Sequence, residues 1–159
     1  MEISRRPAVA FDEEFVNALT RETMRPYVEA TWPSDEEREE YYWLNRFQPN
    51  ETEIIQVDGE DAGRITITRR PGCIVLEEIH ITPRFQGRGI GQMLIGKVLA
   101  EADECRIPTE LKVLKKNPAQ KLYIRLGFVT VRESDERLYM VRGVQQVEVA
   151  DASTRRNSG

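Results

Sequence analysis

The sequence predicts a mixed α/β domain, and three patterns in the order of its apolar residues carry this prediction. Between residues 52 and 81, β-branched runs alternate with the turn sequences "DG" and "RRPG", which is typical of an antiparallel meander. From Gly89 to about Cys105 the apolar residues recur at helical steps of three and four. The alternating run "ELKVL" follows. This order predicts a right-handed β-α-β crossover in which the strands at 73–81 and 110–114 are parallel.

Two helices are expected before these strands. The segment 12–24 has helical spacing of its apolar residues behind an acidic first turn, and Pro26 should end or kink this helix. Ser34 followed by Glu37 matches a capping box. A second helix, rich in aromatic residues, should therefore begin at this point.

The C-terminal part predicts one more helix and a closing hairpin. The segment "NPAQKLYIRLGF" is helical in pattern and should end at Gly127, while "VTVRE" and "RLYMVR" alternate as paired strands do. Beyond Gly143 the hydrophobic pattern is lost, so residues 144–159 are expected to form a disordered tail. A single domain over residues 1–143 is the expected organisation.

Composition excludes several classes of function. The chain has 159 residues, of which 40% are hydrophobic, and it contains no apolar run near the ~20 residues that cross a bilayer and no secretory signal. We therefore expect a soluble, cytoplasmic protein that does not act at a membrane, either a monomer or a homodimer. Two cysteines and one histidine are too few for a disulfide framework or a structural zinc site, so no metal is expected. A net charge of -4 argues against a nucleic-acid partner.

The run "RFQGRGIG" at residues 84–91 lies between a predicted strand and a predicted helix. Glycines there permit positive φ and close approach of a phosphate, and the first N–H groups of a helix lack internal partners. The nucleotide-triphosphate loop is excluded because Gln92 and Met93 stand where Lys and Ser or Thr are needed. The dinucleotide fingerprint lacks its third glycine. The segment is thus an anion-binding loop or, alternatively, a purely structural turn.

One phosphate-binding pattern does match, namely Q/RxxGxG/A, and it is filled by Gln86, Gly87, Arg88, Gly89, Ile90 and Gly91. With this match the sequence resembles the GCN5-related N-acetyltransferase (GNAT) superfamily, in which the segment binds the pyrophosphate of acetyl-coenzyme A through backbone amides. The later segment "NPAQKLYIRLGF" is similar to the stretch of that superfamily that runs from an asparagine through a tyrosine to a Gly-Phe pair. Its matching positions are Asn117, Tyr123, Gly127 and Phe128.

The resemblance implies a fold, a reaction and a co-substrate. It implies that the two parallel strands splay apart, and that the pantetheine arm of acetyl-coenzyme A pairs with the main chain of Ile79, His80 and Ile81. Asn117 would contact the same arm. The implied activity is transfer of the acetyl group to a primary amine, by direct attack within a ternary complex. A non-catalytic module that binds acyl-coenzyme A as a sensor or scaffold is the alternative from another class of function.

Candidates for proton transfer can be named for each step. Glu77 and Glu78 are adjacent on a strand and face opposite sides, so only one faces the acceptor unless a bulge re-aims both. By position in the superfamily pattern Glu77 is the first choice as base, with Glu78 or an ordered water as alternatives. His80 shares the face of Glu78, where it either relays a proton or, as we favour, is a hydrogen-bonded structural residue.

Tyr123 is the candidate acid, because its ordinary pKa of ~10 lets it donate to a thiolate whose conjugate acid has a pKa of ~8.5. The alternative is that Tyr123 only packs its ring. A cysteine nucleophile is disfavoured because the chain has no second histidine to activate one.

The acceptor amine, from a small molecule or a peptide, is expected near the acidic run "SDEEREE" and the aromatic residues around it. Carboxylates and aromatic rings suit a cationic amine, whereas a plain solvated helix face is the alternative. The aromatic residues concerned are Trp32, Tyr41, Tyr42, Trp43 and Phe47.

Overall fold

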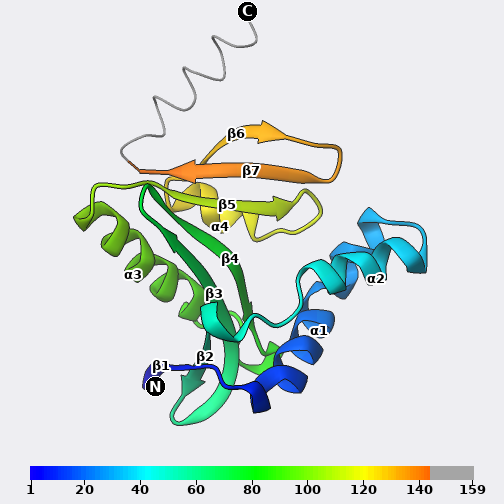
Figure 1. The fold of residues 1–159 in the computed structure, drawn as a ribbon, viewed down its shortest axis with the longest axis horizontal. Coiled ribbons are helices and arrows are strands. Elements are labelled where there is room, and N and C mark those ends of the chain that lie inside the picture. The colour runs from blue at the N-terminus through cyan, green and yellow to red at the C-terminus, as the bar shows by residue number, and fades with distance from the viewer. Residues whose placement is uncertain (144–159) are drawn as a thin grey trace, which may run out of the picture. The chain divides into compact units, whose positions relative to one another are not determined.

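The structure is a computed structural model that describes residues 1–143 (Figure 1). Its helices are α1 (Glu13–Thr31), α2 (Asp35–Leu44), α3 (Ile90–Glu104) and α4 (Gln120–Arg125). Its strands are β1 (Ile3–Pro7), β2 (Thr52–Val57), β3 (Glu60–Arg70), β4 (Cys73–Ile81), β5 (Thr109–Leu114), β6 (Val129–Glu133) and β7 (Arg137–Arg142). The strands join in one mixed sheet in the order β1-β2-β3-β4-β5-β7-β6, which confirms the predicted α/β class. The tail expected at 144–159 lies outside the described residues.

The chain divides into two compact units, and the expected single domain of residues 1–143 stays a prediction. The first unit comprises Met1–Ile67 and Glu77–Gly91. The second comprises Thr68–Leu76 and the described residues from Gln92 onward. The strands β3 and β4 and the helix α3 each contribute residues to both units.

In the first unit, β1, β2 and β3 pair antiparallel. The turn between β2 and β3 is the expected "DG" pair, in which Asp58 and Gly59 have φ of 50° and 82°. Two left-handed residues match the right-handed twist of the flanking strands. β1 was not expected from the sequence, because "ISRRP" lacks the β-branched run that marks the other strands. It owes its place to pairing with β2, from Ile3 opposite Val57 to Pro7 opposite Glu53.

The helices of the first unit correct one prediction and confirm another. α1 continues past Pro26 to Thr31, so Pro26 does not end the helix, and the alternative expectation of a kink there stays a prediction. Pro26 is exposed, and the helix carbonyl that loses its N–H partner there can be hydrated. α2 begins after Ser34 as predicted, because the Ser34 hydroxyl oxygen accepts from the backbone N–H of Glu37 at 3.2 Å. α1 buries a face formed by Val16, Leu19, Thr20, Met24 and Val28.

In the second unit, β4 and β5 are parallel, as the strand-helix-strand order predicts. Their register joins Ile74 to Thr109 and Val75 to Glu110. β5 also pairs antiparallel with β7, and β6 with β7 forms the predicted closing hairpin (Figure 1). α4 is followed by Gly127 with φ of 99°, the left-handed residue expected at a helix end. None of the helices within residues 1–143 is long and apolar enough to cross a bilayer.

Candidate active site

The loop between β4 and α3 contains two glycines whose backbone conformation few other residues adopt. Gly87 has φ of 74° and Gly89 has φ of 77°, and α3 begins directly after them at Ile90. A Cβ built on either glycine would meet no atom within 4 Å. The glycines are therefore needed for the turn itself, and the space over them is open. Such a loop at the start of a long helix directs backbone N–H groups outward, where an anion can accept from them.

Hydrogen bonds that the segment donates to β3 and to the end of β4 order it. The backbone N–H of Thr82 donates to the carbonyl of Ala62 at 2.8 Å. The side-chain amide of Gln86 donates to the carbonyl of Ile81 at 2.9 Å. Gln86, predicted to contact the cofactor, thus also ties the loop to the end of β4.

The two arginines of the loop pack against one buried ring. The guanidinium of Arg84 lies 4.6 Å from the ring centroid of Phe85, and that of Arg88 lies 5.4 Å from it. Arg84 is also ion-paired with Glu60. Arg88 is exposed and, of the two, has the side chain better placed to attract an anion.

The adjacent carboxylates of β4 have different surroundings. Burial along the strand alternates so that Ile74, Leu76 and His80 are buried, which puts Glu78 on their face and Glu77 on the opposite one. The side chain of Glu78 is only 10% exposed, and its Oε2 lies 2.8 Å from Nε2 of His80. The structure thus brings Glu78 and His80 together and separates Glu77 from them.

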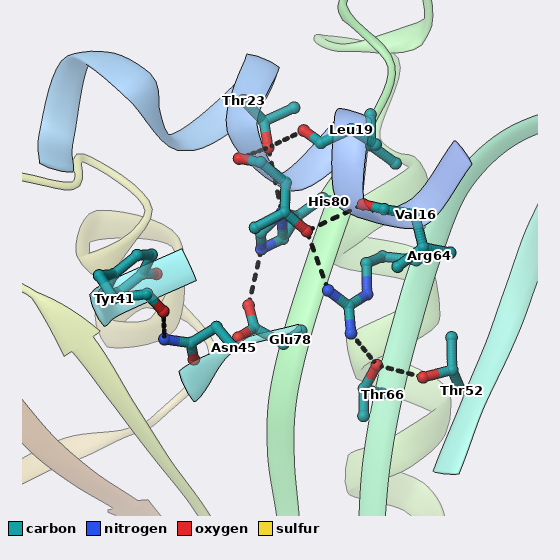
Figure 2. A network of polar contacts seen from close by, with 11 residues as sticks. Val16, Leu19, Thr23, Tyr41, Asn45, Thr52, Arg64, Thr66, Glu78 and His80 are labelled. Atoms are coloured by element: carbon teal, nitrogen blue, oxygen red, sulfur yellow. Dashed lines mark hydrogen bonds and ion pairs between the residues drawn. The ribbon is translucent and has the colours of Figure 1, made fainter. Parts of the chain in front are cut away.

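A chain of polar contacts continues from His80 into α1 (Figure 2). Nδ1 of His80 lies 3.0 Å from the hydroxyl of Thr23. The same hydroxyl lies 2.8 Å from the carbonyl of Leu19, so it has two acceptors within reach. Both ring nitrogens of His80 therefore have partners, which holds the ring in a single orientation.

His80 is a neutral imidazole. Burial, and secondarily the charge of Arg64, lower its pKa to about 3. The 2.8 Å contact with Glu78 could by itself suit an ion pair, but both influences oppose a charge on the ring. Nε2–H therefore donates to the Glu78 carboxylate, and the lone pair of Nδ1 faces the Thr23 hydroxyl, whose one proton it shares with the Leu19 carbonyl.

Beside this chain lies a fully buried arginine that the sequence analysis missed. Nη1 of Arg64 donates to the hydroxyl of Thr20 at 2.9 Å, and Nη2 donates to the hydroxyl of Thr66 at 2.8 Å (Figure 2). The Thr66 hydroxyl is in turn 2.8 Å from that of Thr52. The alternation of "RITIT" puts Arg64 and Thr66 on one face of β3, a polar stripe that could have signalled a buried network.

A pocket of about 330 Å³ lies between α1 and α2, within the first unit. Of the acidic run, only Glu39 lines it, and Glu39 receives two hydrogen bonds from Arg21, at 2.9 and 2.7 Å. Two of the five expected aromatic residues, Tyr42 and Trp43, also line it. The complete lining is Glu13, Asn17, Thr20, Arg21, Glu39, Tyr42, Trp43, Asn45 and Arg46.

Asn117 and Tyr123 belong to the second unit. The side-chain oxygen of Asn117 accepts from the backbone N–H of Ala119 at 2.9 Å, which orders the turn that leads into α4. Tyr123 is the buried residue of α4, and its ring meets that of Phe128 edge-on at 5.9 Å between centroids. The other candidates, from Glu77 to Gly91, belong to the first unit.

Comparison with known proteins agrees with this fold. The family model described as "Acetyltransferase (GNAT) family" matches residues 16–128. A curated GCN5-like protein acetyltransferase from Mycobacterium tuberculosis is 43% identical over 58 residues, which are 35% of this chain and 28% of that relative. The match therefore spans about a quarter of the relative's length.

Solved structures show the same architecture. The PaiA N-acetyltransferase from Thermoplasma acidophilum, in complex with coenzyme A, is 17% identical, with a TM-score of 0.74 over 91% of this chain and 100% of that one. N-acetylglutamate synthase from Neisseria gonorrhoeae, complexed with coenzyme A and N-acetylglutamate, is 20% identical, with a TM-score of 0.60 over 90% of this chain and 35% of that one. These two likenesses establish the fold, and the family model covers most of the chain. The chain belongs to the acetyltransferase (GNAT) family.

Proposed function

We propose that the chain is an N-acetyltransferase that moves the acetyl group of acetyl-coenzyme A to a primary amine by direct attack in a ternary complex. The observation that carries this proposal is the loop at residues 86–91. It has two left-handed glycines under open space, it leads directly into α3, and it follows the strand that bears Glu77 and Glu78. Membership of the GNAT family supports the same reaction.

The residues of the loop fit a pyrophosphate. We propose that backbone N–H groups of Gly87 to Gly91 hold it, with the exposed Arg88 adding positive charge. The main chain of Ile79 to Ile81 would pair with the pantetheine arm, which Asn117 would also contact. When bound, acetyl-coenzyme A supplies an acetyl group already activated as a thioester.

The chain itself must remove a proton from the acceptor amine, which is protonated at neutral pH. The largely buried, hydrogen-bonded setting of Glu78 supports it as the group that accepts this proton, and Glu77 on the opposite face is the alternative. The neutral His80 donates to Glu78 and so holds its carboxylate in one orientation. We further propose that Tyr123 gives a proton to the departing thiolate.

The pocket between α1 and α2 is a candidate site for the acceptor. Its volume of about 330 Å³ is in the range of pockets for small ligands and single side chains. Two acidic residues, Glu13 and Glu39, line it, and Glu39 already shares its charge with Arg21, so a simple cation is not the only amine that the pocket suits. Tyr42 and Trp43 offer flat apolar surface beside these charges.

The proposed function is tested by incubating the protein with acetyl-coenzyme A and a panel of primary amines, and by measuring the free thiol released. Small-molecule amines and peptide N-termini and lysines should both be in the panel. Thiol release above the amine-free background, with acetylated product detected by mass spectrometry, supports the enzyme. Tight binding of acetyl-coenzyme A without turnover across the panel would instead favour a sensor or scaffold.

A further inference from the structure

Arg64 is a permanent positive charge without an ion pair. Its side chain is fully buried, and both of its hydrogen bonds go to neutral hydroxyls, those of Thr20 and Thr66. Its Nε has no partner, and no carboxylate within residues 1–143 lies at ion-pair distance from it. A buried charge in this state is costly unless another charge nearby compensates it.

Glu78 is the group that offers this compensation. Its negative charge acts on Arg64 through the protein interior and raises the arginine's pKa, against the larger effect of burial, which lowers it. The other groups that face the network are Thr20 and Thr23 from α1, Tyr41 from α2, Thr52 from β2, Thr66 from β3 and His80 from β4. Of these groups only Tyr41 and His80 titrate. A tyrosine is neutral near pH 7 because its ordinary pKa is ~10, and His80 is neutral because burial lowers its pKa.

The positive charge of Arg64 also acts on His80. A proton on the ring would put a second positive charge in the interior beside Arg64, and Arg64 opposes it. A proton on Glu78 would leave Arg64 uncompensated. Together these influences favour a charged Arg64, a neutral His80 and an ionised Glu78.

We propose that Arg64 is a positioning residue that sets this charge pattern, so that Glu78 accepts the proton of the acceptor amine and His80 does not. The catalytic part of this inference rests on the proposed function; the charge pattern does not. In the reaction, an N–H bond of the ammonium breaks and an O–H bond forms on Glu78. The resulting neutral acid, beside Arg64, then loses its proton to water, which restores the carboxylate.

Arginine suits this role because it keeps its charge in the interior, where a lysine can lose its proton. Its planar fork is held at both Nη atoms by threonine hydroxyls, so the charge has a fixed position relative to Glu78 and His80 (Figure 2). Thr20 also lines the pocket between α1 and α2, so Arg64 lies one side chain beneath that pocket.

His80 is the only histidine of the chain, which makes the charge pattern directly measurable. We expect the imidazole ¹⁵N spectrum of the full chain, prepared without a histidine tag, to show a neutral ring with its proton on Nε2 from about pH 8 down to about pH 5. In Arg64→Met the apparent pKa of His80 should rise by about one unit or more. Arg69→Met removes an exposed charge of the same strand, paired with Glu101, and should leave the spectrum unchanged.

The catalytic consequence is measured by the pH dependence of kcat/KM. In Arg64→Met the acidic limb should move to higher pH by about one unit or more, because the carboxylate is then protonated more readily. Arg64→Lys should restore much of the wild-type profile on the acidic limb, where low pH favours the protonated, positively charged lysine. A loss of activity in both variants at all pH values, without movement of the limb, would mark a merely structural role and overturn the proposal.

The outcomes separate this inference from the proposed function. A wild-type His80 that titrates near 6.5, or one whose pKa is the same in Arg64→Met, overturns the inference whether or not the protein is an enzyme. The expected spectra in a protein that acetylates no amine leave the charge pattern standing and remove the proposed function. Arg64→Gln, which keeps donors for the two threonines but carries no charge, takes the place of Arg64→Met if that variant does not fold.

Discussion

Gly63 on β3 faces the backbone carbonyl of His80 on β4 so closely that a Cβ at position 63 would overlap with that oxygen. Side chains of Ile55 and Ile81 close the remaining space at 3.3 and 3.2 Å from the same point. The contact fixes the path of β4 where it carries His80 and where the main chain is proposed to pair with the pantetheine arm. A glycine in the middle of a strand otherwise weakens it, so this one is explained by the close approach of the two backbones.

Gly63→Ala is expected to destabilise the protein by about 1 to 3 kcal/mol, because the obstructing atom belongs to the backbone and cannot swing aside. Gly96→Ala is the control. It lies within α3 with no atom within 4 Å of its Cβ position, and it should be neutral or stabilise by up to about 1 kcal/mol through helix propensity. Urea unfolding measures both, and equal stability of Gly63→Ala and wild type would contradict the close approach.

Gly89→Val should weaken the binding of acetyl-coenzyme A by about tenfold or more, or roughly 1.4 kcal/mol. The φ of 77° at Gly89 is strained for a β-branched residue, so the loop must change its path, and the added methyl groups would occupy the open space over it. Calorimetric titration gives the affinity. Gly72→Val, in the turn between β3 and β4, adds the same side chain to open space at an ordinary φ and should bind as wild type does. Unchanged affinity in a folded Gly89→Val protein would show that the loop does not hold the cofactor.

Glu78→Gln should lower turnover most strongly at low pH, and the loss should shrink as pH rises and the free amine becomes available without a base. Glu77→Gln is the matched control, because it makes the same change at the neighbouring residue, which lies on the opposite face of β4. The pH profile of kcat for both variants decides between them. A larger loss in Glu77→Gln would return the role of base to that residue.

Tyr123→Phe should lower turnover by about ten- to a thousandfold and leave the affinity for acetyl-coenzyme A nearly unchanged, as expected for the loss of a proton donor. The edge-on contact with Phe128 needs only the ring, so stability should change by no more than about 1 kcal/mol. An acetyl thioester with a nitrophenyl-type leaving group, whose thiolate needs no proton, should restore most of the rate of the variant. Equal turnover of acetyl-coenzyme A by wild type and variant would reduce Tyr123 to a packing residue.

The free energy of unfolding should fall by about 1.4 kcal/mol between about pH 7.5 and about pH 5.5. In the folded state the pKa of His80 is lowered to about 3, whereas in the unfolded chain it lies near 6.5. In this window the unfolded chain binds the proton and the folded one does not, so stability is lost as pH falls through about 6.5.

Urea unfolding of tag-free protein at the two pH values measures this change. His80→Gln has no histidine to titrate, and its stability, lower overall because the network is broken, should be nearly the same at both pH values. A fall of the same size in His80→Gln would assign the pH dependence to other groups.

Much of the fold could be predicted from the sequence because its signals are local. The period of the apolar residues marked the central strands and α3, the "DG" pair marked the turn after β2, and Ser34 marked the start of α2. The left-handed glycines of residues 86–91 follow from a pattern six residues long. Signals of this kind depend on neighbours in the chain, and a sequence displays such neighbours directly.

The failures have non-local causes. β1 exists because β2 offers it a partner, and α1 continues past Pro26 because that residue faces solvent. The choice between Glu77 and Glu78 as the base could not be made from their spacing, since both lie on one strand, and it stays a prediction. The different surroundings of the two carboxylates depend on Thr23, 57 residues from His80, and on Arg64, which the sequence alone presents as an ordinary strand residue.

The sequence by itself determined the class of fold, the position of the glycine loop and the residue types available for acid-base chemistry, because each is written in a short run of neighbouring residues. Tertiary structure decided which carboxylate contacts the histidine, that this histidine is neutral, and that an arginine without an ion pair lies near both. Protonation depends on burial and on charges brought close by folding. For that reason the charge pattern of the site exists only in the folded chain.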